Sequence, residues 1–132
     1  MEMEQLKKAL RAQIEEYKTL AFELSDQMAR EPEIGSQEYK SSAAIVKLLR
    51  DHGIEVEYPF AGYRTAFRGQ ICPERKVRMA LLAEYDALRG LGHACGHCAS
   101  GSGSVLAALA FQAFRDEYSF GVDIIGTPDE EY

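Results

Sequence analysis

The side chains most capable of chemistry are gathered in one short stretch of the chain and in its last residues. Residues 84–97 hold two of the three histidines, and two of the three cysteines lie within this stretch or one residue beyond it. Glu84 and Asp86 begin the stretch, and Asp129-Glu130-Glu131 follows later. Thiolate, imidazole and carboxylate are the groups that bind zinc-like divalent metals. These segments therefore predict part of a metal site.

Cys95 and His97 are only two residues apart. Neighbours on one face of a helix are three or four residues apart, whereas residues i and i+2 of an extended segment point the same way. The pair follows a predicted buried strand, and open α/β sheets form their sites at the carboxyl ends of strands. We expect both side chains in a loop at such an end. A buried structural cysteine and a hydrogen-bonded histidine are the alternative.

Glu130 and Glu131 follow a second predicted strand and the turn residues Gly126-Thr-Pro128. Adjacent carboxylates point in different directions, so one can bind a metal while the other takes a proton from water. Taken alone, the acidic run is also typical of a solvated segment. Its placement after a strand, as at Glu84 and Asp86, favours the metal site.

Cys95-Gly-His-Cys98 is also a C-x-x-C motif. Such a pair at the start of a helix can act as a redox dithiol, because the helix dipole lowers the pKa of a thiol there. It can also be half of a structural zinc site, but the chain has no second C-x-x-C and Cys72 is isolated.

The composition indicates one folded domain of 132 residues, 46% of them hydrophobic. A net charge of −6 argues against nucleic acid or an anionic membrane as the partner. No apolar run approaches the roughly 20 residues that a membrane span needs. An odd number of cysteines favours a reducing cytoplasm over a disulfide framework.

Apolar residues at steps of three or four predict a long amphipathic helix over residues 2–31. A second helix is expected over residues 36–52, with Ser36 as its N-cap and Gly53 after its end. Its buried stripe is expected to be Tyr39, Ala43, Val46 and Leu49.

Alternation of apolar and charged residues predicts an edge strand over residues 54–60, with residues 64–69 as its hairpin partner. The apolar run 77–83 is typical of an interior parallel strand. The remaining elements are a glycine-rich loop, a helix and a strand, over residues 90–103, 103–116 and 120–125. The predicted fold class is α/β, with a mixed, mostly parallel sheet layered with helices.

Three segments resemble motifs of one known family. Residues 83–97 resemble the signature of metallopeptidase family twenty, and more narrowly of its amidohydrolase branch of aminoacylase-like enzymes, plant auxin–amino-acid hydrolases and aminobenzoyl-glutamate hydrolases. Residues 32–39 and 126–131 resemble two further motifs of the branch, in the right order. The resemblance implies that residues 1–132 are the N-terminal portion of a zinc-peptidase-like catalytic domain. It also implies hydrolysis of an amide bond in a small substrate, an N-acyl amino acid or a dipeptide.

The resemblance also implies roles for individual residues. Cys95, His97 and Glu131 match ligands of a two-metal centre for zinc or manganese, and Glu130 matches the general base. Asp86 matches an acidic residue that orients a ligand. Glu84 stands where more distant relatives have a histidine ligand, but that position is not a ligand in this branch, so no role is assigned to it.

The chain departs from the family at Arg89, where the branch usually has Pro, and at Cys98, where it has Asn or Asp. The larger departure is length, because the remaining histidine ligands and a dimerisation domain of the family would follow residue 132. We therefore expect this short chain to be inactive by itself. The alternatives are a truncated non-catalytic fragment and a C-x-x-C thiol module. Apolar side chains left without partners predict a homo-oligomer, and they are Leu106, Leu109, Phe111, Phe114 and Ile124.

Overall fold

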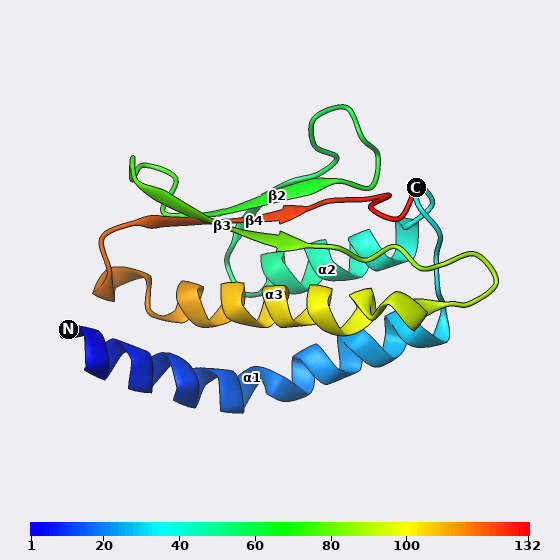
Figure 1. The fold of residues 1–132 in the computed structure, drawn as a ribbon. Coiled ribbons are helices and arrows are strands. Elements are labelled where there is room, and N and C mark those ends of the chain that lie inside the picture. Colours follow the sequence, from blue (N-terminus) through cyan, green and yellow to red (C-terminus); the bar gives the residue numbers. More distant parts are fainter.

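The computed structural model describes residues 1–132 and contains three α-helices and four strands (Figure 1). In chain order, the elements are α1 (Met3–Arg30), α2 (Tyr39–Asp51), β1 (Glu55–Glu57), β2 (Phe67–Ile71), β3 (Arg78–Ala83), the 3-10 turn η1 (His93–Cys95), α3 (His97–Ala113), the 3-10 turn η2 (Arg115–Glu117) and β4 (Gly121–Gly126). Both predicted N-terminal helices and the final strand are confirmed to within a few residues. No helix is long and apolar enough to cross a bilayer.

The strands form one mixed sheet in the order β1-β2-β4-β3. The predicted α/β class and its mixed sheet are confirmed, but the expectation of mostly parallel pairing is wrong for this chain. Only β3 and β4 are parallel, whereas β1–β2 and β2–β4 are antiparallel. The parallel pair is joined through α3, the crossover that parallel strands require, and β1 and β2 form a hairpin.

The helices cover one face of the sheet in two layers (Figure 1). Helices α2 and α3 lie against the strands, and α1 packs along α3 on the side away from the sheet. Val122 and Ile124 of β4 and Phe67 of β2 point into this interface and are fully buried. The other face of the sheet carries no helix.

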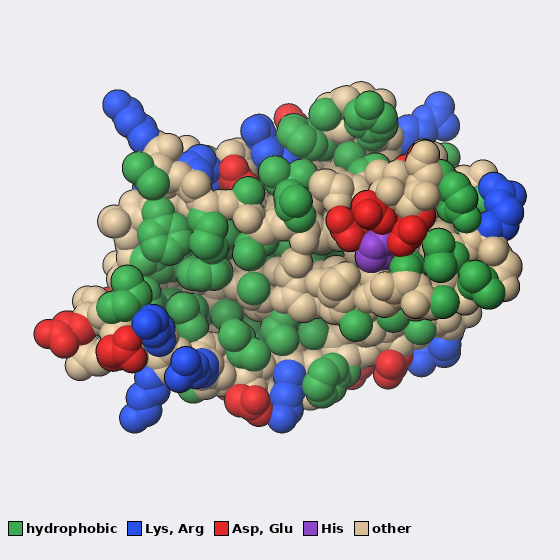
Figure 2. Space-filling view, viewed as in Figure 1, with side chains coloured by type: hydrophobic (Ala, Val, Ile, Leu, Met, Phe, Trp, Pro, Cys, Tyr) green, Lys and Arg blue, Asp and Glu red, His purple; other side chains and the backbone are tan.

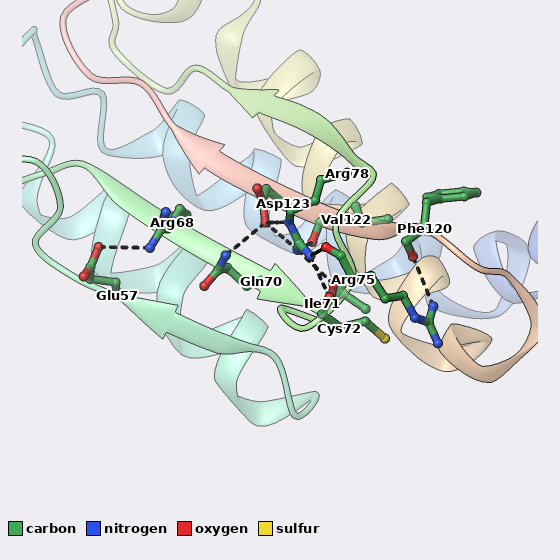
Figure 3. A network of polar contacts seen from close by, with 10 residues as sticks. All are labelled: Glu57, Arg68, Gln70, Ile71, Cys72, Arg75, Arg78, Phe120, Val122 and Asp123. Atoms are coloured by element: carbon green, nitrogen blue, oxygen red, sulfur yellow. Dashed lines mark hydrogen bonds and ion pairs between the residues drawn. The ribbon is translucent and has the colours of Figure 1, made fainter.

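Polar side chains occupy that helix-free face (Figure 3). The guanidinium of Arg78 donates to the carboxylate of Asp123 over 2.7 Å and to the main-chain oxygens of Ile71 and Cys72 over 3.0 and 2.6 Å. Gln70 lies 3.5 Å from the same Asp123 oxygen. Hydrogen bonds in which the donor is charged are stronger than hydrogen bonds between two neutral groups. This network therefore ties β2, β3 and β4 together where no helix covers them.

The second helix differs in detail from its prediction. It begins at Tyr39, so Ser36 is not its N-cap; Ser36 has a left-handed backbone, with φ of 64°, and points elsewhere. Val46 and Leu49 are buried as expected, but Tyr39 and Ala43 are exposed because Ile45 faces the core in their place. The buried face of α2 is therefore rotated slightly about the helix axis relative to the predicted face.

The third strand lies at the edge of this sheet and not in its interior. Its only strand neighbour is β4, and Val77 and Leu82 are 77% and 57% exposed. The apolar run predicted the strand correctly. It carried no information about which other strands would flank it.

The third helix begins at His97, six residues before the predicted start at 103. Gly96 adopts a left-handed conformation, with φ of 87°, that an L side chain rarely takes, and this lets η1 turn directly into the helix. The glycines between 101 and 103, predicted to be loop, are therefore helical. At Gly101, a Cβ would overlap the carbonyl oxygen of Glu84, so the missing side chain allows α3 to pack closely against the end of β3.

The apolar side chains on which the predicted self-association rests are largely covered within this chain. Leu109 and Ile124, expected to lack partners, are buried, and Leu106, Phe111 and Phe114 are partly buried. Packing of α1 along α3 supplies much of this cover. The homo-oligomer itself stays a prediction.

Two glycines of α3 provide a matched test of how closely α3 packs against the end of β3. Gly101→Ala should destabilise the protein by about 1–3 kcal/mol, because the new methyl group must displace the backbone at Glu84. Gly103→Ala, with open space around it, should stabilise it by about 0.5–1 kcal/mol through helix propensity. Urea unfolding of both variants measures the difference. Equal effects would show that the two helix positions do not differ in packing.

Candidate metal centre

Three segments distant in sequence meet at the carboxyl ends of β3 and β4. Thr127, just after β4, donates its amide to the carbonyl of Ala83 over 2.9 Å, which keeps the two strand ends together. The amide of Ala87 donates to the carbonyl of Glu33 over 2.8 Å. Residues 33–38, 84–97 and 127–131 therefore line one region. This is the edge of the sheet where the sequence predicted a site.

Asp86 lies at the centre of this region and is fully buried. One carboxylate oxygen is 3.0 Å from Nδ1 of His97, and the other accepts the amide of Glu131 over 2.9 Å. The main-chain oxygen of Asp86 is 2.9 Å from the same Nδ1 and 3.6 Å from Sγ of Cys95. Because these oxygens only accept, Nδ1 of His97 must carry a proton and donate it. Asp86 thereby fixes the orientation of the imidazole.

The opposite nitrogen of His97 faces a group of carboxylates. Nε2 lies 2.8 Å from Glu84, 3.6 Å from Glu130 and 3.8 Å from Glu131. Burial lowers the pKa of His97, but the hydrogen bond to Asp86 and the charges of Asp86, Glu84 and Glu130 outweigh it, so the net pKa is raised. The surroundings of Nε2 therefore favour a positive charge.

Glu130 is the most exposed member of the cluster. Partial loss of solvent raises the pKa of its carboxyl group, and the negative charges of Glu131 and Glu84 raise it further. A carboxylate with a raised pKa accepts a proton more readily near neutral pH. This environment suits the general-base role predicted for Glu130.

Two groups of ligand atoms surround His97. Cys95, His97 and Glu131 each offer an atom within 4.8 Å of the others, and so do Glu84, His97 and Glu130. Figure 2 shows a histidine flanked by acidic side chains on this face. The structure thus brings together the three residues predicted as ligands, with Asp86 behind them and Glu130 beside them. Their roles stay predictions.

Several known proteins are similar to this chain in sequence or in fold. The chain is 31% identical over 143 aligned positions to Xaa-Arg dipeptidase of Mus musculus, covering 98% of this chain and 33% of the relative. It is 30% identical over 128 positions to a p-aminobenzoyl-glutamate hydrolase subunit of Escherichia coli K12, covering 83% of this chain and 26% of the relative. A Bacillus subtilis crystal structure, a dinuclear metal-binding peptidase from the M20 family, superposes with a TM-score of 0.80 at 23% identity, covering 89% of this chain and 36% of that one. No protein-family model matches.

The homologues of this chain are M20 peptidases. The resemblance to metallopeptidase family twenty is therefore confirmed, and it extends over one part of the length of these relatives. The chain spans a third or less of the length of these two curated M20 relatives.

The M20-like segment 32–39 has a positioning role that sequence analysis missed. The fully buried carboxylate of Glu38 accepts the amide of Asp129 over 2.8 Å and the hydroxyl of Thr65 over 3.1 Å. Ser36, predicted as a helix cap, instead donates its hydroxyl to the Asp129 side chain over 3.2 Å. These bonds hold the turn that presents Glu130 and Glu131. Only the resemblance of the segment to a family motif signalled its importance.

Sequence analysis assigns no role to Glu84, yet this residue makes the shortest contact with Nε2 of His97.

His93 lies near His97, and both its ring nitrogens are buried without a hydrogen-bond partner. Burial, followed by the nearby His97, lowers the pKa of His93, which favours its neutral form. Cys98 is a free thiol that packs partly against the core, and Cys95 and Cys72 are also free.

The buried carboxylate of Glu38 predicts that the stability of the protein depends on pH. Burial raises the pKa of Glu38 above its usual 4.5, although its hydrogen bonds offset part of the effect. The native state therefore holds this proton more tightly than the unfolded chain, and the resulting stability is present below pH 4.5 and lost as pH rises through the raised pKa. Glu38→Gln cannot titrate. Urea unfolding across this range should show wild type losing stability relative to the variant.

The exposed Glu55→Gln serves as the control for loss of one carboxylate. If wild type instead gains on Glu38→Gln as pH rises, the hydrogen bonds of the ionised Glu38 outweigh the cost of burying its charge.

Proposed function

We propose that this chain carries part of the metal centre of a metal-dependent amidohydrolase or peptidase of the M20 type. The observation that carries the proposal is the meeting of Cys95, His97 and Glu131 at the ends of two parallel strands. Thiolate, imidazole and carboxylate together suit zinc, and a donor set richer in oxygen suits manganese. The substrate would be a small molecule with an amide bond, an N-acyl amino acid or a dipeptide. Relatives that act on dipeptides and on an aminobenzoyl-glutamate support this class.

The residues present fit such a metal. His97 is held by Asp86 through Nδ1, which leaves Nε2 to bind. Cys95 and Glu131 contact Asp86 as well, through its main-chain oxygen and its carboxylate. Ligands oriented by such contacts bind metal more tightly than free side chains do. A divalent metal bound here supplies a Lewis acid that polarises an amide carbonyl and activates water.

The protein's own part in the chemistry is to move a proton. Glu130 is exposed enough to reach water, and its neighbours raise its pKa. It can accept a proton from the attacking water and return it to the leaving amine. Asp86 remains buried behind the ligands and keeps the imidazole in one orientation. The assignment therefore separates proton transfer at Glu130 from metal binding at Glu131.

Zinc binding tests the ligand assignment. Calorimetric titration with zinc chloride should show one weak site per chain, because three protein ligands are fewer than the four of a closed site. Cys95→Ser should weaken binding by about tenfold or more, the size of effect that even indirect partners of a metal have. Cys98→Ser is the matched control, a thiol three residues away that lies outside both ligand groups. Tight binding of two zinc ions, or loss of binding in the control, contradicts the assignment.

Amide hydrolysis tests the role of Glu130. Release of amine from N-acyl amino acids and dipeptides is measured for the chain alone and after addition of a C-terminal fragment of an M20 relative. Any activity should fall by about 10²–10⁴ in Glu130→Gln, the usual contribution of a general base, while zinc affinity is retained. Glu55→Gln controls for the loss of a carboxylate. Activity that survives Glu130→Gln would remove the residue from the mechanism.

A further inference from the structure

The two edges of the sheet differ in how they are protected from pairing with another strand. An edge strand presents unpaired N–H and C=O groups, and proteins blunt such edges with short strands and charged side chains. Strand β1 has both protections, since it is three residues long and exposes Glu55 and Glu57 at its ends. Strand β3 is six residues long, and Arg78 is its only charged residue. The edge at β3 is therefore the one open to a further strand.

The backbone of β3 directs hydrogen-bonding groups away from the sheet. The carbonyl of Ala83 accepts the amide of Thr127 over 2.9 Å, so it points toward β4. Because the N–H and C=O groups of successive residues in a strand point to opposite edges, those of Arg78, Ala80 and Leu82 point outward. These groups can form a ladder with a strand that lies beside β3.

Small residues of α3 line the helix side of this edge. Ser104 donates its hydroxyl to the outward carbonyl of Leu82 over 2.7 Å, so this face of the helix lies beside the strand edge. Ser100 and Ala107 are one turn away on the same face. Gly103 is exposed, and a Cβ there would meet nothing within 4 Å. No long side chain at these helix positions blocks the approach of another strand.

The side chains of this edge are apolar and carry no repelling charge. Val77, just before β3, and Leu82 are 77% and 57% exposed, and Ala80 is also exposed. The guanidinium of Arg78 pairs with Asp123 of β4 over 2.7 Å. Figure 2 shows hydrophobic side chains gathered where Figure 1 shows β3 and the adjoining part of α3. Two copies of this edge can therefore meet without electrostatic repulsion, although the chain has a net charge of −6.

We propose that two copies of this chain pair through their β3 strands, antiparallel and centred on Ala80, into a dimer with one continuous sheet. The contact lies outside the apolar residues from which the sequence predicted self-association, and it does not depend on the proposed function.

The register follows from the symmetry of such a dimer. A twofold axis perpendicular to the sheet makes the pairing antiparallel and places each residue opposite one on the same face. Centred on Ala80, this small residue lies opposite its own copy, and Arg78 lies opposite Leu82. All three have outward backbone groups, so each opposed pair can exchange two hydrogen bonds. The carbonyl of Leu82 has a second lone pair for this bond beside the hydroxyl of Ser104.

Sedimentation velocity of the whole chain over a range of micromolar concentrations tests the proposal. Wild type should sediment as a dimer. Leu82→Lys should shift it to the monomer, because a charged side chain on an edge strand opposes pairing. Leu91→Lys is the matched control, since Leu91 is 70% exposed but lies outside β3, and it should leave the dimer intact. Circular dichroism melts check that both variants fold.

Hydrogen exchange of the wild-type chain, followed by NMR, locates the contact without a substitution. Exchange of the amides of Ala80 and Leu82 should slow as the concentration of the chain rises, because these groups enter a ladder only in the dimer. The amides of Met79 and Leu81 point toward β4 and serve as internal controls with unchanged exchange.

The proposal fails if wild type stays monomeric across these concentrations. It also fails if Leu82→Lys folds and leaves the dimer intact, or if dimer formation leaves exchange at Ala80 and Leu82 unchanged. Should Leu82→Lys not fold, the exchange measurement on wild type decides alone. If these amides become protected only when a C-terminal fragment of an M20 relative is added, the edge pairs with a strand of that fragment and not with a second copy.

Discussion

The buried carboxylate of Asp86 is the interaction on which the arrangement of this site depends. A charge removed from water is costly unless hydrogen bonds replace its solvation. Here the amide of Glu131 donates to one carboxylate oxygen, and Nδ1 of His97 lies 3.0 Å from the other while bonding to the main-chain oxygen of Asp86. These two partners belong to different segments, the start of α3 and the turn after β4. Meeting the needs of one carboxylate therefore joins the segments that carry the candidate ligands.

The supporting fold brings those segments within reach. The parallel pairing of β3 and β4 places their carboxyl ends side by side, and α3 starts next to them because Gly96 permits a sharp turn. The absence of a side chain at Gly101 then lets the helix approach the end of β3. The strand pairing and these two glycines thus bring the start of α3 to the ends of β3 and β4, where His97 lies.

The acidic residues around Nε2 give the site a consistent electrostatic character. Glu84, Glu130 and Glu131 lie close enough to repel one another, and only His97 stands among them as a potential cation. Such a cluster gains from any bound positive charge, a proton or a metal.

The sequence by itself determined the elements whose signals are local. Periodic apolar residues located α1 and α2, and the motifs at 84–97 and 126–131 located Asp86, Cys95, His97, Glu130 and Glu131. Only the tertiary structure placed β3 at an edge, started α3 at His97, and turned Ser36 and Glu38 toward Asp129. It also brought Glu84 against His97. The physical reason is that periodicity reports the environment of a residue's own helix or strand. A strand's neighbours, a glycine's close contact and a buried carboxylate's partners depend on segments many residues away.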